Sequence, residues 1–113
     1  MNGKFVMVYL TAKNEKEALA IARALVEERL AACVNLLGKT RSIYRWQGRI
    51  ADEREVAFMV KTRKTLLPAL TARVKKLHSY ECPCIVALPI VGGSDDFLEW
   101  LDQETKKIAR VRR

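Results

Sequence analysis

The stretch Phe5-Val6-Met7-Val8-Tyr9-Leu10-Thr11 is a continuous, largely apolar run of strand length, and the signals of a helix follow it directly. Asn14 and Glu17 have the spacing of a capping box, in which two side chains satisfy backbone N–H groups at a helix start. A strand that is apolar on both faces and joined to an amphipathic helix predicts a sheet packed against helices. Apolar residues recur at helical spacing to about Ala32, at Ala18, Ala22, Leu25, Val26 and Leu30.

Strands and helices continue to alternate along the rest of the chain. Residues 33–37 and 41–46 predict one long or broken strand, interrupted near Gly38, where a glycine supports a bulge. The order β-α-β-β-α-β with an added helix predicts a ferredoxin-like α+β fold with an antiparallel sheet, formed by residues 1–113 as a single domain. The other expected elements are a turn at 47–53, a strand at 56–60, a helix opened by Thr65, a strand at 85–91 and a terminal helix capped by Ser94.

The consecutive apolar residues in three of the strands indicate that both faces of the sheet need cover. Two helices on one face cannot provide it, so either the C-terminal helix crosses to the other face or other subunits cover it. We favour other subunits in a chain this small. Tyr44 and Trp46, near the end of the long second strand, are candidates for reaching a neighbouring copy, because exposed aromatic side chains are costly in a monomer.

Composition narrows the classes of function. The net charge of the 113 residues is +8, but it is concentrated in a basic tail at about 106–113, and removing the tail's five basic residues leaves +3. This distribution argues against a nucleic-acid-binding module, although the tail keeps that hypothesis open. No apolar run is long enough to span a membrane. Three cysteines, an odd number, in a chain with enough core to fold unaided favour reduced thiols and a cytoplasmic location.

Residues 77–84 gather the single histidine, a tyrosine, a carboxylate and two of the three cysteines. The imidazole of His78 beside the thiols of Cys82 and Cys84 is a competent ligand set for a soft or borderline metal such as a cuprous ion. The alternative is structural. A histidine near a helix end suits the helix dipole, Pro83 stops a helix, and the two cysteines serve as small apolar residues entering the last strand.

Five blocks along the chain, in order and without large gaps, resemble the CutA family of divalent-cation-tolerance proteins. The similarity runs from about Phe5 to Thr105. It implies a ferredoxin-like protomer in a tight homotrimer similar to PII-type signalling proteins, a role in tolerance of copper or other divalent metals, no enzymatic activity and no organic cofactor. The blocks are Glu28–Asn35, Ser42–Gly48, Glu55–Arg63, His78–Pro83 and Phe97–Leu101.

Residues of the family carry over unevenly to possible metal ligands. His78 matches the histidine before the family's Tyr-Glu-x-Pro element, and Cys33 matches the cysteine of its Ala-Cys-x-Asn block. Members implicated in copper binding have a further cysteine where this chain has Leu10, and some have a second histidine where it has Leu77. Cys84 stands where the family commonly has glutamate. The metal candidates are therefore His78, Cys33, Cys82 and Cys84, with Cys33 alternatively a small core residue.

The remaining shared polar and aromatic residues suggest a pocket in a cleft between subunits. Two alternatives stay open, namely aromatic packing in the trimer and a structural ion pair of Lys61 with Glu55 or Glu81. Three functions follow: a trimer that binds metal ions, a PII-like signalling or scaffold trimer that binds a small anionic ligand or partner, and a nucleic-acid-binding module. The predicted pocket residues are Tyr44, Trp46, Glu55, Lys61, Tyr80 and Glu81.

Overall fold

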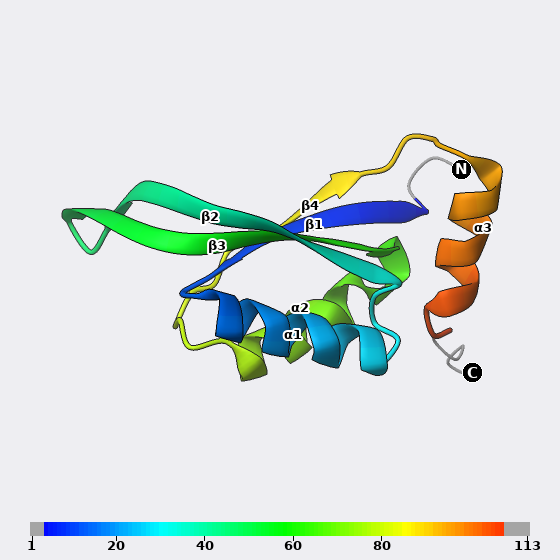
Figure 1. The fold of residues 1–113 in the computed structure, drawn as a ribbon, viewed down its shortest axis with the longest axis horizontal. Coiled ribbons are helices and arrows are strands. Elements are labelled where there is room, and N and C mark those ends of the chain that lie inside the picture. The colour runs from blue at the N-terminus through cyan, green and yellow to red at the C-terminus, as the bar shows by residue number, and fades with distance from the viewer. Residues whose placement is uncertain (1–3, 108–113) are drawn as a thin grey trace, which may run out of the picture.

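A computed structural model describes residues 4–107 of the chain as an α+β fold with a four-stranded antiparallel sheet in the order β2-β3-β1-β4. The helices α1 and α2 lie against one face of this sheet (Figure 1). The order of elements agrees with the expected β-α-β-β-α-β pattern and its added helix. The elements are β1 (Phe5–Ala12), α1 (Glu15–Glu27), β2 (Cys33–Trp46), β3 (Arg49–Arg63), a 3-10 turn (Lys64–Leu66), α2 (Leu67–Leu77), β4 (Ile85–Pro89) and α3 (Asp95–Glu104).

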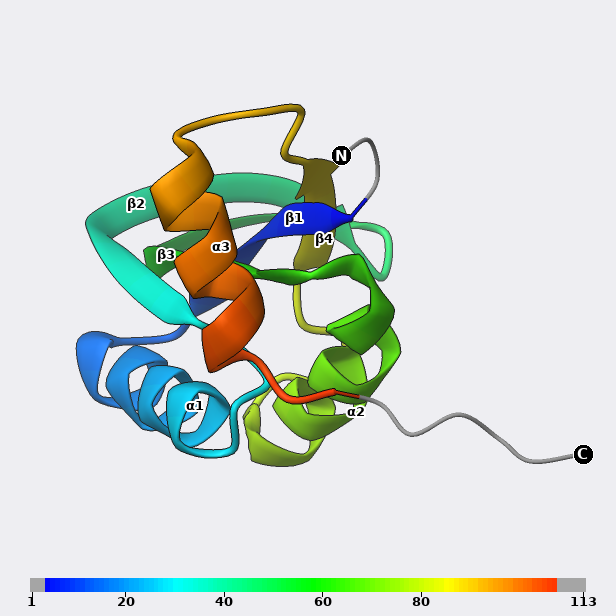
Figure 2. The same cartoon turned by 90° about the vertical axis from the view of Figure 1, so that its right-hand side faces the viewer.

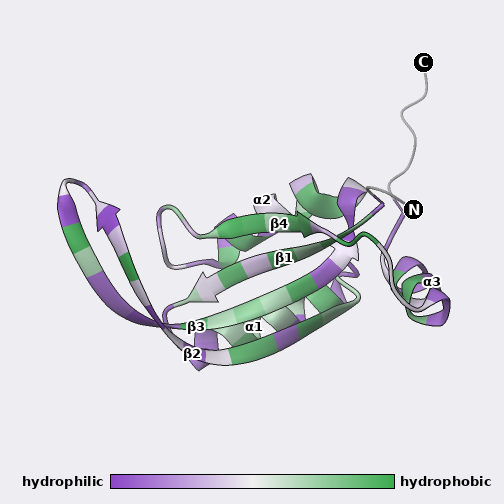
Figure 3. Cartoon of the chain, turned by 90° about the horizontal axis from the view of Figure 1, so that it is seen from above, coloured by the Kyte–Doolittle hydropathy of each residue, from purple (hydrophilic) through white to green (hydrophobic). Residues whose placement is uncertain are grey.

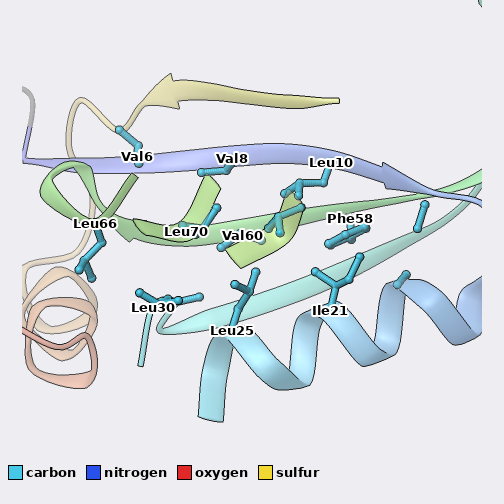
Figure 4. Packing of buried hydrophobic residues seen from close by; sticks show 14 of the residues in the cluster. Val6, Val8, Leu10, Ile21, Leu25, Leu30, Phe58, Val60, Leu66 and Leu70 are labelled. Carbon is cyan, nitrogen blue, oxygen red and sulfur yellow. The ribbon is translucent and has the colours of Figure 1, made fainter. Parts of the chain in front are cut away.

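The core lies between the sheet and the two helices (Figure 4). Strand side chains alternate between faces, so every second residue of β1 enters this core while the residues between them lie on the opposite face. Phe58 at the centre of β3 is fully buried and pairs across strands with Leu10 and Leu36. The helices contribute Ile21, Leu25, Leu70 and Val74 from their inward faces.

Helix α1 begins as predicted but ends earlier. Asn14 caps it by accepting the Glu17 N–H at 2.9 Å, and the Glu17 carboxylate in turn accepts the Lys13 N–H at 3.0 Å. The expected end near Ala32 was wrong, because the helix ends at Glu27 and Arg29 adopts a left-handed φ of 60°. Leu30 is still buried, so the apolar periodicity continued past the helix and hid its end.

The β2–β3 hairpin is longer than the sequence indicated. The turn expected at 47–53 is only two residues, Gln47 and Gly48, whose φ values of 51° and 80° suit a two-residue hairpin connection. Arg49 already pairs with Trp46, so β3 starts there and the charged residues that follow are strand residues exposed on a projecting ribbon. The interruption near Gly38 is confirmed as a register shift between Leu36 and Gly38, where Gly38 has a φ of 117°.

Three other boundaries differ from those expected. A 3-10 turn precedes α2, so the α-helix starts at Leu67 rather than at Thr65. Strand β4 ends at Pro89 rather than at residue 91, and the next residue, Ile90, donates its N–H to the Phe5 carbonyl at 3.0 Å. Ser94 stands at the N-cap of α3 as predicted, but its side chain makes no capping hydrogen bond.

The sheet face opposite α1 and α2 stays uncovered by the helices of this chain. Helix α3 packs across the end of the sheet, where Leu98 and Leu101 contact Phe5 and Ala32 (Figure 2). Apolar segments of all four strands are visible from the uncovered side (Figure 3). On β4, Val86 and Leu88 are 53% and 50% exposed there. We call this surface the open face.

The segment after α3 is held against the rest of the chain as far as the structure describes it. The buried Arg63 donates from Nε to Thr105 Oγ1 at 2.8 Å and from Nη2 to the Lys106 carbonyl. The Lys106 N–H donates to the Arg29 carbonyl at 2.8 Å. The rest of the predicted basic tail, residues 108–113, lies outside the described residues. Within residues 4–107, no helix has the length and apolar character to cross a membrane.

Candidate functional site

A groove of about 620 Å³ lies on the open face where three segments meet. The end of β1 contributes Tyr9 and Thr11, and the hairpin contributes Ser42, Tyr44, Trp46, Glu53 and Glu55. The loop between α2 and β4 closes it with residues 80–84. The strand register places Ser42 opposite Glu53, so these alternate positions of the hairpin share one face.

Glu55 and Tyr80 form the wall of the groove nearest the core. The Glu55 side chain belongs to a residue that is only 6% exposed, and the Tyr80 hydroxyl donates to its Oε2 at 2.8 Å. Burial, followed by this hydrogen bond to a carboxylate, holds the pKa of Tyr80 well above its usual value. Tyr80 therefore stays protonated at neutral pH and acts as a donor that orients Glu55.

His78 is buried behind that wall with both ring nitrogens engaged. Its Nε2 lies 2.7 Å from the Thr11 carbonyl oxygen, and its Nδ1 accepts the Tyr80 N–H at 3.1 Å. A carbonyl only accepts, so Nε2 carries the proton and the ring is the neutral Nε2–H tautomer. Glu17 approaches Nδ1 at 4.0 Å and accepts the Ser79 N–H at 2.8 Å. In this geometry His78 positions Tyr80 and has no free nitrogen for a metal.

The three cysteines are free thiols in different surroundings. Cys82 is exposed and Cys84 half-buried, and both line the groove. Burial, with smaller contributions from Glu55 and Cys82, raises the pKa of the Cys84 thiol. Cys33 pairs with Lys61 at the opposite end of β3, six residues from Glu55, and is therefore about 20 Å from the groove at strand spacing.

The four predicted metal ligands are not brought together in one chain. Across the described residues, no group of three or more histidine, cysteine, aspartate or glutamate side chains is arranged to hold a metal ion. The nitrogens of His78 are occupied and Cys33 is remote, so neither fits a shared site in this conformation. Cys82 and Cys84 remain as a thiol pair with access to the groove.

Five of the six predicted pocket residues do meet, but Lys61 lies elsewhere. Its Nζ donates to Asn35 Oδ1 at 2.9 Å and lies 5.7 Å from the centre of the Phe97 ring. The expected ion pair of Lys61 with Glu55 or Glu81 is not formed among residues 4–107. The five that line the groove are Tyr44, Trp46, Glu55, Tyr80 and Glu81.

Some lining residues were not singled out from the sequence. Tyr9 and Thr11 alternate with the core residues of β1 and therefore face the groove, which a period of two in a strand could have indicated. Ser42 and Glu53 were missed because Glu53 was assigned to a turn. Correct placement of the two-residue turn would have paired them across the hairpin.

Residues 6–104 match the model of the family described as CutA1 divalent ion tolerance protein. The chain belongs to the CutA family. A divalent-cation tolerance protein CutA from Thermus thermophilus is 50% identical over 99 residues, which cover 88% of this chain and 96% of that protein. The solved structure of the Thermus thermophilus protein matches with a TM-score of 0.88 at 48% identity, over 90% of this chain and 99% of the other. The shared fold thus includes the hairpin and the open face of this CutA protein.

Other CutA relatives show how varied the setting of this domain is. The mouse protein CutA is 45% identical over 95% of this chain, but the chain spans only 60% of that relative's length. A CutA from Archaeoglobus fulgidus, described as periplasmic, matches with a TM-score of 0.87 at 40% identity, over 90% of this chain and 99% of that one. None of these descriptions names a catalytic activity.

Proposed function

We propose that this CutA protein acts in divalent-cation tolerance as a cytoplasmic homotrimer that binds copper or other divalent ions, with the groove at a cleft between subunits. The observation that supports it most is the open face, which carries the groove and large exposed apolar side chains. The free thiols of all three cysteines agree with a reducing compartment.

The projecting hairpin supports assembly. It extends beyond the helices (Figure 1), and its Ile43 and Ile50 are 68% and 62% exposed. Monomeric proteins seldom expose apolar side chains of this size side by side along a ribbon, so a neighbouring copy is the natural cover. An obligate interface of this kind should bury about 2,000 Å² or more.

Light scattering coupled to size exclusion at low micromolar concentration should give three times the 12.9 kDa mass of the chain. Trp46→Ala should shift the equilibrium toward monomer, because it removes a large side chain from the hairpin. Trp100→Ala is the matched control, since Trp100 on α3 has a similar exposure of 40% against 43% for Trp46. A stable wild-type monomer, or equal weakening by both variants, would contradict the proposed role of the hairpin.

Cys82 and Cys84 are the best metal ligands that the described part of the chain offers. Both line the groove, and thiolates are preferred by soft ions such as the cuprous ion. Residues i and i+2 of an extended segment direct their side chains to one side, which suits a bridging ion. Such an ion would be held by the two sulfurs, and further ligands would come from a neighbouring subunit or from solvent.

Anaerobic titration against a cuprous chelator should show that Cys82→Ser with Cys84→Ser lowers the affinity at least about tenfold. Cys33→Ser, which changes a thiol about 20 Å from the groove, should leave the affinity unchanged. Because burial raises the pKa of the Cys84 thiol, affinity should increase with pH as the thiolate forms. Equal affinity of the double variant and the wild type would remove copper from the proposal.

A PII-like trimer that binds a small ligand is the second candidate, and the groove itself favours it. A volume of about 620 Å³ is within the ordinary range for small-molecule sites. The anionic ligand expected from the sequence does not suit the three carboxylates of the lining.

A further inference from the structure

The charge of the groove is opposite to the charge of the chain. Three of its twelve lining residues are carboxylates, Glu53, Glu55 and Glu81, and none is lysine, arginine or histidine among the residues that the structure describes. The chain as a whole carries a net charge of +8. The groove is therefore a local negative site that attracts cations and repels anions.

The basic residues of the hairpin lie mostly on its other face. Arg41 makes a forked pair with Asp52, with both N–O distances at 2.8 Å, and strand alternation puts these two residues opposite the groove side. Arg49 pairs with Trp46 near the tip and is not part of the lining. The carboxylates of the groove are thus left without a basic partner from the hairpin.

Aromatic side chains supply the other half of the lining. Tyr9, Tyr44, Trp46 and Tyr80 all border the groove. Ring faces attract cations through their quadrupole, most strongly when the cation carries an apolar body that is removed from water. The protonated state of Tyr80 keeps this wall free of a phenolate and its hydroxyl directed to Glu55.

The same geometry favours an organic cation over a metal ion at the carboxylates. A hard divalent ion needs about six oxygen ligands, whereas the described residues contain no three acidic, histidine or cysteine groups arranged around one point. An ammonium or guanidinium group needs only one or two carboxylates, because its hydrogen bonds are few and its remaining surface contacts aromatic rings.

We propose that the groove binds a small organic cation, an ammonium or guanidinium group on an apolar body, between the Glu55–Tyr80 wall and the aromatic residues of the hairpin. The proposal rests on the ligand-binding cleft proposed above and specifies the charge and class of its ligand. Glu55 is the main anchor, since it is buried, oriented by Tyr80 and still borders the groove.

The test uses the intact protein and 2-phenylethylammonium as the probe, with 3-phenylpropionate as an anion on the same apolar body. Trp100→Phe leaves Trp46 as the single tryptophan, so its fluorescence reports occupancy of the groove. The ammonium should saturate the signal at neutral pH, and the anion should bind at least about tenfold more weakly. Equal affinity for the two probes, or no saturable binding of the ammonium, would overturn the proposal.

Charge-removing variants identify the anchor. Glu55→Gln keeps an acceptor for the Tyr80 hydroxyl but removes the charge, and it should weaken ammonium binding about tenfold. Glu81→Gln should weaken it less, and Glu99→Gln on α3, outside the groove, should leave it unchanged. Unchanged affinity in both Glu55→Gln and Glu81→Gln would overturn the assignment, with light scattering confirming that the variants keep the wild-type assembly.

Failure of this inference and failure of the proposed function give different results. Titration in the presence of a metal chelator, and in Cys82→Ser with Cys84→Ser, should leave ammonium binding intact, because the carboxylates and rings remain. Ammonium binding that disappears with the chelator would overturn the inference in favour of a metal-linked site. Loss of ammonium binding in a trimer that still takes up cuprous ion would reject the organic cation and retain the proposed function.

Discussion

Phe58→Ala is expected to lower the free energy of unfolding by about 3–5 kcal/mol. Phe58 is fully buried at the centre of β3, against Leu10 and Leu36 of the neighbouring strands (Figure 4). Its removal loses the transfer free energy of the ring and leaves a cavity that the sheet and α1 cannot close. Chemical denaturation at a fixed protomer concentration measures the change, because assembly makes apparent stability depend on concentration.

Phe97→Ala is the matched control for this prediction. The same truncation on α3 removes a ring that is 42% exposed and packs mainly on Trp100, so its cost should be about 1 kcal/mol or less. Similar losses in the two variants would show that the layer between the sheet and α1 is not the main source of stability.

His78→Leu is expected to lower the free energy of unfolding by about 2–5 kcal/mol. Leucine fills much of the same space but leaves the Thr11 carbonyl and the Tyr80 N–H without the partners that the imidazole provides. Each buried polar group that loses its partner costs about 1–3 kcal/mol. Denaturation of the variant and the wild type under the same conditions gives the difference.

Two amides that each replace half of the imidazole separate the contributions. His78→Gln can still donate to the Thr11 carbonyl, and His78→Asn can still accept the Tyr80 N–H. Each should recover part of the stability lost in His78→Leu. If leucine is tolerated as well as either amide, the two hydrogen bonds do not stabilise the fold and His78 is free for another role.

Much of the fold was accessible from local patterns. The apolar run of β1, the capping pair Asn14 and Glu17, and Gly38 each act over a few residues, so type and order of the elements followed from them. Boundaries were less accessible. The end of α1 depends on a left-handed Arg29, a conformation that usually takes glycine, and the hairpin turn uses Gln47 at a position where asparagine is more typical.

The candidate site was predicted by residue type more than by arrangement. Resemblance to the CutA family selected Tyr44, Trp46, Glu55, Tyr80 and Glu81, and the structure brings these together in the groove. It also selected Lys61, which the strand register carries to the far end of β3. A set of shared residues contains both groove residues and packing residues, and only position in the sheet separates them.

The sequence by itself determined the family, the α+β class and the order of the elements, because periodicity, caps and turn residues act locally along the chain. Tertiary structure alone decided the fate of His78. Its ring is engaged by Thr11, 67 residues away in the chain, and by the N–H of Tyr80. Tertiary structure also decided the separation of Lys61 from Glu55 and the acidic character of the groove in a basic chain. These depend on strand register and burial, which set the neighbours of a side chain only once distant segments have packed.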